Sequence, residues 1–258
     1  MSAPLTSLWK VRDRMPPSTR QALRRATDPA LAPIGSVAGV QATAVRPAAV
    51  GLTFDDGPDP EVTPAVLAAL ATGEATATFF ALVDRAERHP DLVRAVVAAG
   101  HEIGLHGPDH RRLTTLGGEP VRPLLADARA RLEAIAGVPV RWFRPPFGSQ
   151  SLGTYMAARR AGLMPVVWSA EGEDWVDQPP ERVADRVMER LRPGGVILLH
   201  DGLAGDPRER AAADPLHDVR GEIVTHVLAR LRDRDLRATK IGELVTTGRT
   251  RRSAWFRP

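Results

Sequence analysis

Strand-like and helix-like segments alternate along this chain from about residue 46 onwards. The strand-like runs are short and apolar, and the segments between them carry the apolar spacing of amphipathic helices. Strands that alternate with helices are typical of βα units, which build a parallel sheet covered by helices. Roughly seven such units favour an α/β fold of the (β/α) barrel kind over an open sheet. We expect strands at 50–54, 75–82, 101–106, 140–143, 164–169, 195–200 and 236–241, and helices at 62–70, 91–99, 121–136, 152–161, 181–191 and 217–232.

The composition excludes several classes of site. The 258 residues contain no cysteine, so disulfides, cysteine–zinc sites and cysteine nucleophiles are absent, and any metal must be bound by His, Asp or Glu. The formal net charge of +4 is spread along the chain and does not indicate nucleic-acid binding, although it leaves anionic lipids or phosphorylated substrates open. No GxGxxG motif follows the first predicted strand, which argues against a dinucleotide-binding fold.

Basic segments flank the alternating region. We expect a basic N-terminal extension at 1–45, a folded domain at 46–247 and a loosely held basic tail at 248–258. The extension contains a short, basic, weakly amphipathic helix candidate at 16–25, which could pack on the domain edge or lie peripherally on an anionic membrane. The sequence shows no secretory signal and no run of about 18 apolar residues. We therefore expect a cytoplasmic protein. If the helix candidate binds an anionic membrane, the protein would lie at the inner face of that membrane.

Two adjacent carboxylates, Asp55 and Asp56, end the first predicted strand, and a Gly-Pro turn follows them. Strand ends of this kind are where α/β folds place their sites. Neighbouring carboxylates repel each other, and a cation bound to one would leave the other free for proton transfer. An ordinary Asp-Gly turn with two solvated carboxylates is the alternative, and this stretch alone does not separate the two.

Two histidines, His106 and His110, follow the third predicted strand at a spacing that can bind one metal. With one Asp they would form an open triad that leaves positions for water and substrate. A pair at this spacing is often merely solvated, but here it lies at a strand end like the Asp pair. His101 begins the strand and is expected to be structural, while Asp109 is a weaker candidate for a place near the metal.

An arginine fixed by prolines, Arg144, follows the fourth predicted strand. It could pair with Asp55 and hold that carboxylate ionised and oriented as a base. The prolines also expose the backbone N–H of Phe147, a candidate oxyanion donor. A surface Arg in a proline-rich loop is the alternative for this fragment.

Acidic, aromatic and histidine residues follow the fifth and sixth predicted strands. The segment 171–175 ends in Asp174 and Trp175, an acid and an indole that suit the orienting of a base and stacking on a sugar or acyl group, or simply a Trp that plugs the rim of a barrel. His200 ends the sixth strand and suits a general acid if a carboxylate keeps it protonated. Both Asp174 and Asp201 are candidate partners for it.

Together these segments resemble the polysaccharide deacetylases with a NodB homology domain, carbohydrate esterase family four. The resemblance covers roughly residues 46–245 and preserves the order of the five family motifs. The first motif is matched without change and is the most specific, and the third has Phe where Tyr is common. The matching segments are Thr53–Pro58, His106 with His110, Arg144–Gly148, Asp174–Trp175 and Leu198–Asp201.

The resemblance implies a distorted (β/α) barrel with seven or eight strands and a role for each motif residue. Asp56, His106 and His110 would bind a divalent metal, zinc first and Co²⁺, Ni²⁺ or Mn²⁺ as alternatives. The other implied roles are as follows: Asp55 would be the general base oriented by Arg144, the N–H of Phe147 an oxyanion donor, His200 the general acid tuned by Asp174, and Trp175, Leu198 and Pro146 would contact the substrate.

Two positions depart from the family pattern. Gly107 stands where the second motif usually has Ser or Thr, so a hydroxyl that would steady the metal loop is missing. Glu171-Gly172 replaces the Asp and hydroxyl residue that usually begin the fourth motif. Neither change removes a metal ligand or a proton carrier, so they bear on substrate and loop geometry.

The implied activity is hydrolysis of an amide, with removal of an N-acetyl group from an amino sugar such as N-acetylglucosamine. An intracellular location would favour an oligosaccharide, a lipid-linked sugar or a nucleotide-linked sugar. A deformylase or a hydrolase of a non-sugar amide in a small metabolite is the first alternative, and a non-catalytic carbohydrate-binding protein is the second. The complete set of metal and acid–base residues argues against the second alternative. The sequence does not indicate an oligomeric state.

Overall fold

The fold is organised around one central strand, β2 (Ala48–Asp55), in a computed structural model that describes residues 35–41, 48–116, 120–202, 219–253 and 255. Seven of the eight residues of β2 are buried, as its continuous apolar run predicts for a strand of a parallel sheet. It pairs with β3 (Thr78–Leu82) through its second half and with β9 (Leu236–Thr239) through its first half. On its other side it pairs with β8 (Val196–His200).

The eight-stranded sheet is parallel throughout and runs in the order β6-β5-β4-β3-β2-β8-β7, with β9 paired to β2. It confirms the expected distorted (β/α) barrel. The carboxyl ends of the strands meet at one end of the molecule, so the residues that follow them converge there. The remaining strands of this sheet are β4 (Glu102–Gly107), β5 (Trp142–Phe143), β6 (Met164–Pro165) and β7 (Ala170–Glu171).

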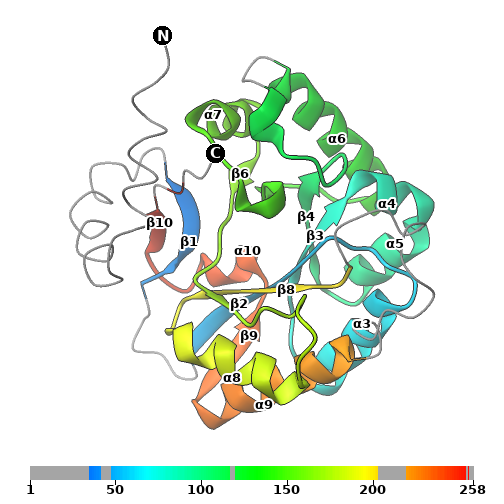
Figure 1. The fold of residues 1–258 in the computed structure, drawn as a ribbon. Helices are drawn as coiled ribbons and strands as arrows, with labels where there is room; N and C mark the ends of the chain where they lie inside the picture. The colour runs from blue at the N-terminus through cyan, green and yellow to red at the C-terminus, as the bar shows by residue number, and fades with distance from the viewer. Residues whose placement is uncertain (1–34, 42–47, 117–119, 203–218, 254, 256–258) are drawn as a thin grey trace.

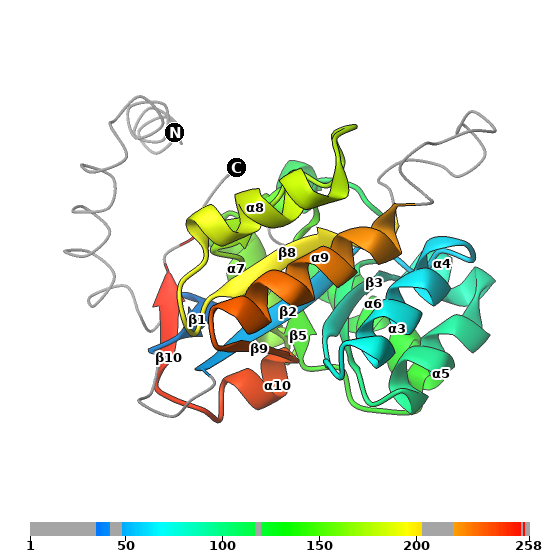
Figure 2. The ribbon, with the colours of Figure 1, turned by 90° about the horizontal axis from the view of Figure 1, so that it is seen from below.

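Helices surround the sheet on the outside (Figures 1 and 2). Local signals explain several of their ends: Ser151 and Thr154 form a capping box at the start of α7, and Gly137 ends α6 with a positive φ of 69°. Short helices at 83–88 and 241–244 were not predicted. The α-helices are α3 (Val62–Thr72), α4 (Val83–Arg88), α5 (Pro90–Ala98), α6 (Val121–Ala136), α7 (Leu152–Arg160), α8 (Pro180–Arg190), α9 (Arg220–Asp233) and α10 (Ile241–Leu244).

The strand expected at 164–169 is divided between two neighbours. Only β6 (Met164–Pro165) pairs with β5. The chain then runs from this edge of the sheet to the opposite edge, where β7 pairs with β8. On the way, the N–H of Val167 donates to the carbonyl of Val37 at 2.8 Å. The expected strand is therefore replaced by a short strand and a connecting segment, within which only Pro165, Val166 and Val167 are buried.

A separate two-stranded sheet joins β1 (Ser36–Val40) to β10 (Thr250–Ser253) in antiparallel register. These strands lie in the predicted extension and the predicted tail. The expectation of a loosely held tail is wrong for residues 250–253 and 255, because β10 is paired and Trp255 is buried. The helix candidate at 16–25, and with it the membrane hypothesis, lies outside the described residues.

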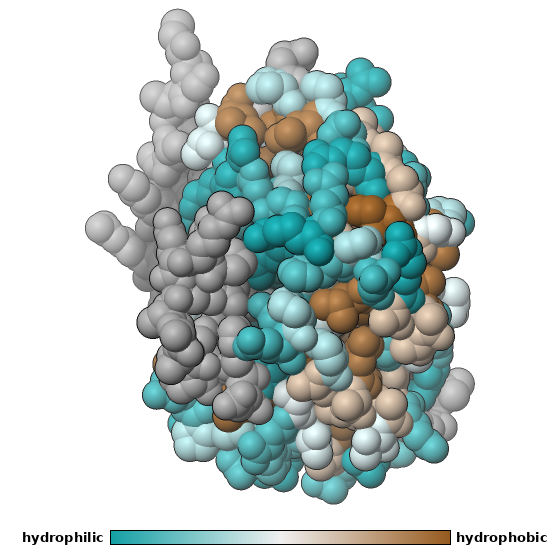
Figure 3. All heavy atoms as spheres, turned by 90° about the vertical axis from the view of Figure 1, so that its right-hand side faces the viewer, coloured by the Kyte–Doolittle hydropathy of each residue, from teal (hydrophilic) through white to brown (hydrophobic). Residues whose placement is uncertain are grey.

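One face of the molecule shows no large continuous apolar area. On the face formed by the helices on the right of Figure 1, hydrophilic residues interrupt the apolar ones (Figure 3). Within the described ranges, no helix combines the length and apolar character needed to cross a membrane.

Candidate active site

The turn after β2 directs two carboxylates into the mouth of the barrel. Asp56 adopts a positive φ of 75°, and its carbonyl accepts a hydrogen bond of 2.8 Å from buried Arg85. A Cβ at Gly57 would lie 2.1 Å from a carboxylate oxygen of Asp201, so no side chain fits there. The positive φ of Asp56 is strained for a residue other than glycine, and the packing around the turn maintains it.

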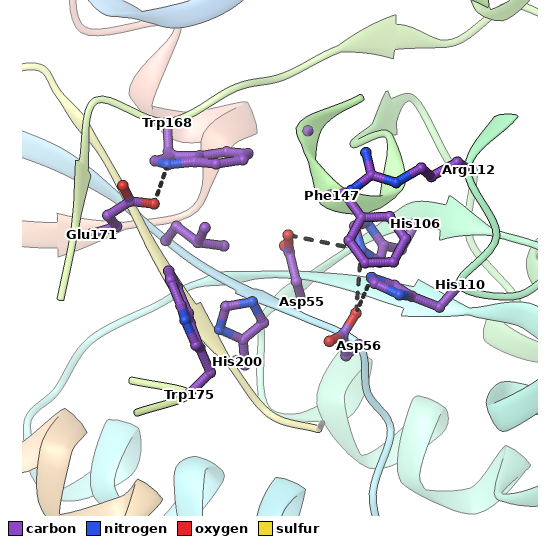
Figure 4. Close-up of a pocket in the computed structure, with 12 residues that line it drawn as sticks. Asp55, Asp56, His106, His110, Arg112, Phe147, Trp168, Glu171, Trp175 and His200 are labelled. Carbon is purple, nitrogen blue, oxygen red and sulfur yellow. Dashed lines mark hydrogen bonds and ion pairs between the residues drawn. The ribbon is translucent and has the colours of Figure 1, made fainter. Parts of the chain in front are cut away.

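Asp56, His106 and His110 converge on one point, as predicted. The Oδ1 atom of Asp56 lies 3.2 Å from Nε2 of His106 and 3.2 Å from Nε2 of His110 (Figure 4). Nδ1 of His106 lies 2.8 Å from the carbonyl of Arg144, which can only accept, so Nδ1 carries the proton. In the neutral ring, Nε2 then presents a lone pair to Asp56.

This donor set fits a divalent cation. The ligand atoms all lie within 4.8 Å of one another, and Oδ1 of Asp56 is buried without a hydrogen-bond partner. Burial opposes ionisation of Asp56, but its contact with His106 and the positive charge of His200 hold its pKa below the ordinary value. Burial lowers the pKa of His110 to about 4, which keeps that ring neutral and ready to coordinate. One carboxylate and two neutral imidazoles are a typical open metal triad.

Asp55 is paired with Arg144. Nη1 of Arg144 lies 2.7 Å from Oδ1 of Asp55 and 2.7 Å from Oγ1 of Thr53, and its guanidinium stacks on the ring of Phe80 at 4.2 Å. Both charged side chains are buried, which strengthens their interaction. The other carboxylate oxygen, Oδ2 of Asp55, lies 4.0 Å from Nε2 of His106 and remains open toward the metal triad.

His200 is held by Asp174, one of its two predicted partners. Nδ1 of His200 lies 2.8 Å from Oδ1 of Asp174, and its backbone N–H donates to Oδ2 at 2.8 Å. Burial works against the charged ring, but Asp174, Asp56 and Asp55 raise the pKa of His200 to about 9. Asp201, the other predicted partner, instead accepts a hydrogen bond of 2.8 Å from Thr63, and burial raises the pKa of Asp201 to about 7.

Arg220, at the start of α9, completes this pair and was not predicted. Its guanidinium forms a buried ion pair with Oδ2 of Asp174 and donates to the carbonyl of His200 at 3.3 Å. No local sequence pattern distinguishes this arginine from the others on the chain, since only the fold brings it to Asp174. It balances the second oxygen of a carboxylate whose first oxygen holds the imidazole.

Replacing Arg220 with methionine is expected to destabilise the protein by about 3 kcal/mol, because it leaves Asp174 buried with less compensation. Denaturant unfolding measures the change. Arg230→Met is the matched control on the same helix: its ion pair with Asp185 is 38% and 48% exposed, and its loss is expected to cost less than about 1 kcal/mol. Equal effects of the two substitutions would contradict the role given to Arg220.

The metal triad, Asp55 and His200 all line one cavity of about 600 Å³ (Figure 4). Trp175 and Leu198 line it as predicted, and the ring of Trp175 meets the edge of His200 at 5.4 Å. Phe147 also lines it, with a positive φ of 59°. Pro146 is buried and is not among the lining residues, which gives no support to its predicted contact with substrate. The full lining is Asp55, Asp56, His106, His110, Arg112, Phe147, Gly148, Trp168, Glu171, Trp175, Leu198 and His200.

Both departures from the family motifs have local explanations. Gly107 has a φ of +146°, which side-chain-bearing residues rarely adopt. Glu171 accepts a hydrogen bond of 2.8 Å from Trp168 and pairs with Arg190 at 3.1 Å. A Cβ at Gly172 would lie 2.5 Å from Val183, so α8 packs directly on this backbone.

Two other predicted residues lie outside the metal triad. The carboxylate of Asp109 pairs with Arg111. His101 accepts a hydrogen bond from the N–H of Ala77 at 3.3 Å just before β4, at the end opposite His106, and burial lowers its pKa to about 4. The prediction that His101 is structural agrees with this position.

Comparisons with known proteins identify the family. The family model described as polysaccharide deacetylase matches residues 42–166. The chitooligosaccharide deacetylase of Azorhizobium caulinodans is 40% identical over 171 residues, which are 66% of this chain and 79% of that protein. A solved peptidoglycan N-acetylglucosamine deacetylase is 26% identical with a TM-score of 0.71, over 83% of this chain and 94% of that one. A mutant of a family pseudoenzyme is also similar, at 25% identity and a TM-score of 0.68, over 78% of this chain and 68% of that one. This chain belongs to the polysaccharide deacetylases, carbohydrate esterase family four.

Proposed function

We propose that this protein is a metal-dependent hydrolase that removes the N-acetyl group from an amino sugar. The observation that carries the proposal is that the Asp56, His106 and His110 triad shares one cavity with Asp55 and His200. Each of these last two residues is held from behind by a buried partner, Arg144 for Asp55 and Asp174 for His200. Several similar proteins are deacetylases of N-acetylated sugars, which supports the choice of substrate class.

The residues divide the chemistry between them. A bound divalent cation, zinc being our proposal, would polarise the amide carbonyl and lower the pKa of a water molecule. Asp55, held in place by Arg144, accepts the proton of the attacking water. His200, kept charged by Asp174, donates a proton to the amine nitrogen as the C–N bond breaks. The backbone N–H of Phe147 is proposed as a donor to the oxyanion. Acetate and a free amino sugar result.

The walls of the cavity suit an acylated sugar. Trp168 and Trp175 offer aromatic faces for a sugar ring, and Leu198 offers an apolar surface to the acetyl methyl group. The volume of about 600 Å³ exceeds what an acetamide group fills, so at least one sugar unit has room beside the reacting atoms.

Release of acetate from N-acetylglucosamine oligomers, measured with and without a chelator, tests the proposal. We expect the chelator to lower the rate by about two orders of magnitude or more, and Zn²⁺ to restore it, because the lost cation activates both water and carbonyl. Formate from N-formyl substrates without acetate would instead support a deformylase. Metal-loaded protein that releases no acetate would contradict deacetylation of sugars, and protein that binds no metal would support a non-catalytic member of the family.

A further inference from the structure

One arginine, Arg112, lines the cavity and has no charged partner among the residues that the structure describes. Its guanidinium lies 4.2 Å from the centre of the Phe147 ring, and that ring lies 4.2 Å from the ring of His110 (Figure 4). The neighbouring Arg111 behaves differently, because it closes an ion pair with Asp109. This cation–π contact places the exposed guanidinium of Arg112 beside the metal triad, and its N–H groups make no hydrogen bond within the described part of the chain.

The cavity contains no other Lys or Arg among its described lining residues. Two of its acidic residues already have basic partners, Asp55 with Arg144 and Glu171 with Arg190. The third, Asp56, belongs to the triad that fits a cation. The charge of Arg112 is thus not needed to balance the site. A guanidinium offers two parallel N–H groups, which match a carboxylate or phosphate.

We propose that Arg112 binds an anionic group carried by the saccharide next to its N-acetylated unit, so that the substrate is an acidic N-acetylated saccharide. The inference rests on the proposed function. A carboxylate and a phosphate share the required chemistry, and substrates that carry one or the other distinguish them.

Kinetics on matched substrates test this proposal. The probes are neutral N,N′-diacetylchitobiose, its 1-phosphate, and a disaccharide of N-acetylglucosamine with N-acetylmuramic acid, which bears a carboxylate. We expect the metal-loaded wild type to prefer one anionic probe by about tenfold or more, and Arg112→Gln to remove that preference through KM. Arg112→Lys should keep only part of it, because a point charge replaces the planar pair of donors. Arg111→Gln is the matched control and should keep the full preference.

The outcomes separate this inference from the function on which it rests. Equal kcat/KM on neutral and anionic probes in the wild type would overturn the role of Arg112 while acetate release upholds the deacetylase. An Arg112→Gln variant that loses the same factor on every probe would also overturn it. No acetate from any probe would overturn both.

A second inference rests on a different contact, made by Trp255 behind the cavity wall. Nε1 of Trp255 donates to the carbonyl of Gly148 at 3.0 Å, and its own carbonyl accepts from Nε2 of Gln150 at 2.6 Å. Its ring contacts that of Trp168 in a tilted arrangement, with the ring centres 5.1 Å apart. The pairing of β10 with β1 brings this residue to the site from the far end of the chain.

The loop that Trp255 holds carries Phe147, the proposed oxyanion donor. Phe147 and Gly148 have positive φ angles of 59° and 61° in succession, a conformation that surrounding contacts must maintain. We propose that Trp255 is a positioning residue that keeps this loop and Trp168 in place. The proposal rests on the proposed function, since it concerns the same reaction.

Two substitutions test Trp255. Trp255→Phe keeps an aromatic ring against Trp168 but loses the N–H, and Trp255→Ala loses both. We expect kcat for acetate release to fall by about threefold in the first and about tenfold or more in the second, with metal content unchanged and the protein folded. Partial recovery of kcat in the Phe variant separates positioning from folding. Unchanged kcat in folded Trp255→Ala protein would overturn the proposal, as would a loss that only follows the fraction of unfolded protein.

Discussion

The substitution Asp55→Asn is expected to abolish turnover while the metal stays bound. The amide of Asn cannot accept the proton of water, and loss of a general base typically costs about 10²–10⁴-fold in kcat. Asp55 makes its short contact with Arg144 rather than with the two histidines, so its charge is not required to assemble the metal triad. Initial rates of acetate release, together with metal content by mass spectrometry, measure both parts of this expectation.

The neighbouring substitution provides the contrast. Asp56→Asn removes the only carboxylate of the triad and should lower metal content and activity together. Asp91→Asn on α5 serves as a control, because that side chain is 95% exposed. Activity retained in Asp55→Asn protein, or metal lost from it, would refute the division of labour between the two carboxylates.

The sequence predicted the place of the site because of a general property of parallel sheets. Their strands all end at one edge, so polar residues at Asp55, His106, Arg144 and His200 had to meet if the alternation was real. The continuous apolar run of β2 predicted a strand of a parallel sheet, because a strand that is buried on both faces does not alternate apolar and polar residues. Eight strands in one parallel sheet confirm that interpretation.

Other contacts left no local signal. The pairing of β1 with β10 joins segments about 200 residues apart, and neither has a distinctive apolar pattern. β7 has two residues and was indistinguishable from a loop. Arg220, Arg112 and Trp255 owe their positions to the folded chain, and arginine in an Arg-rich sequence carries little information by itself. Tertiary packing, rather than propensity, decides such features.

The substitution His200→Gln is expected to lower kcat/KM most on substrates with poor leaving groups. An amine must be protonated as it departs, whereas a nitrophenolate leaves without help. We therefore expect His200→Gln to lower kcat/KM on an N-acetyl sugar by about 10²–10³-fold and on 4-nitrophenyl acetate by much less. Similar losses on both substrates would contradict the role of general acid, and a control substitution at exposed Glu181 of α8 should change neither.

The pH profile supplies the second half of this prediction. Asp174 raises the pKa of His200 to about 9, so the charged acid persists through neutral pH and is lost as the pH rises through that value. Its contribution to stability is present in full below about pH 6.5, the unfolded value, and declines towards pH 9. A bound cation acts in the opposite direction, so the basic limb of kcat/KM should lie at or below pH 9 in the metal-loaded enzyme. Asp174→Asn removes the charge that favours the imidazolium while burial still disfavours it. The basic limb should then move down by about one pH unit or more, and a limb that stays in place would show that another group donates the proton.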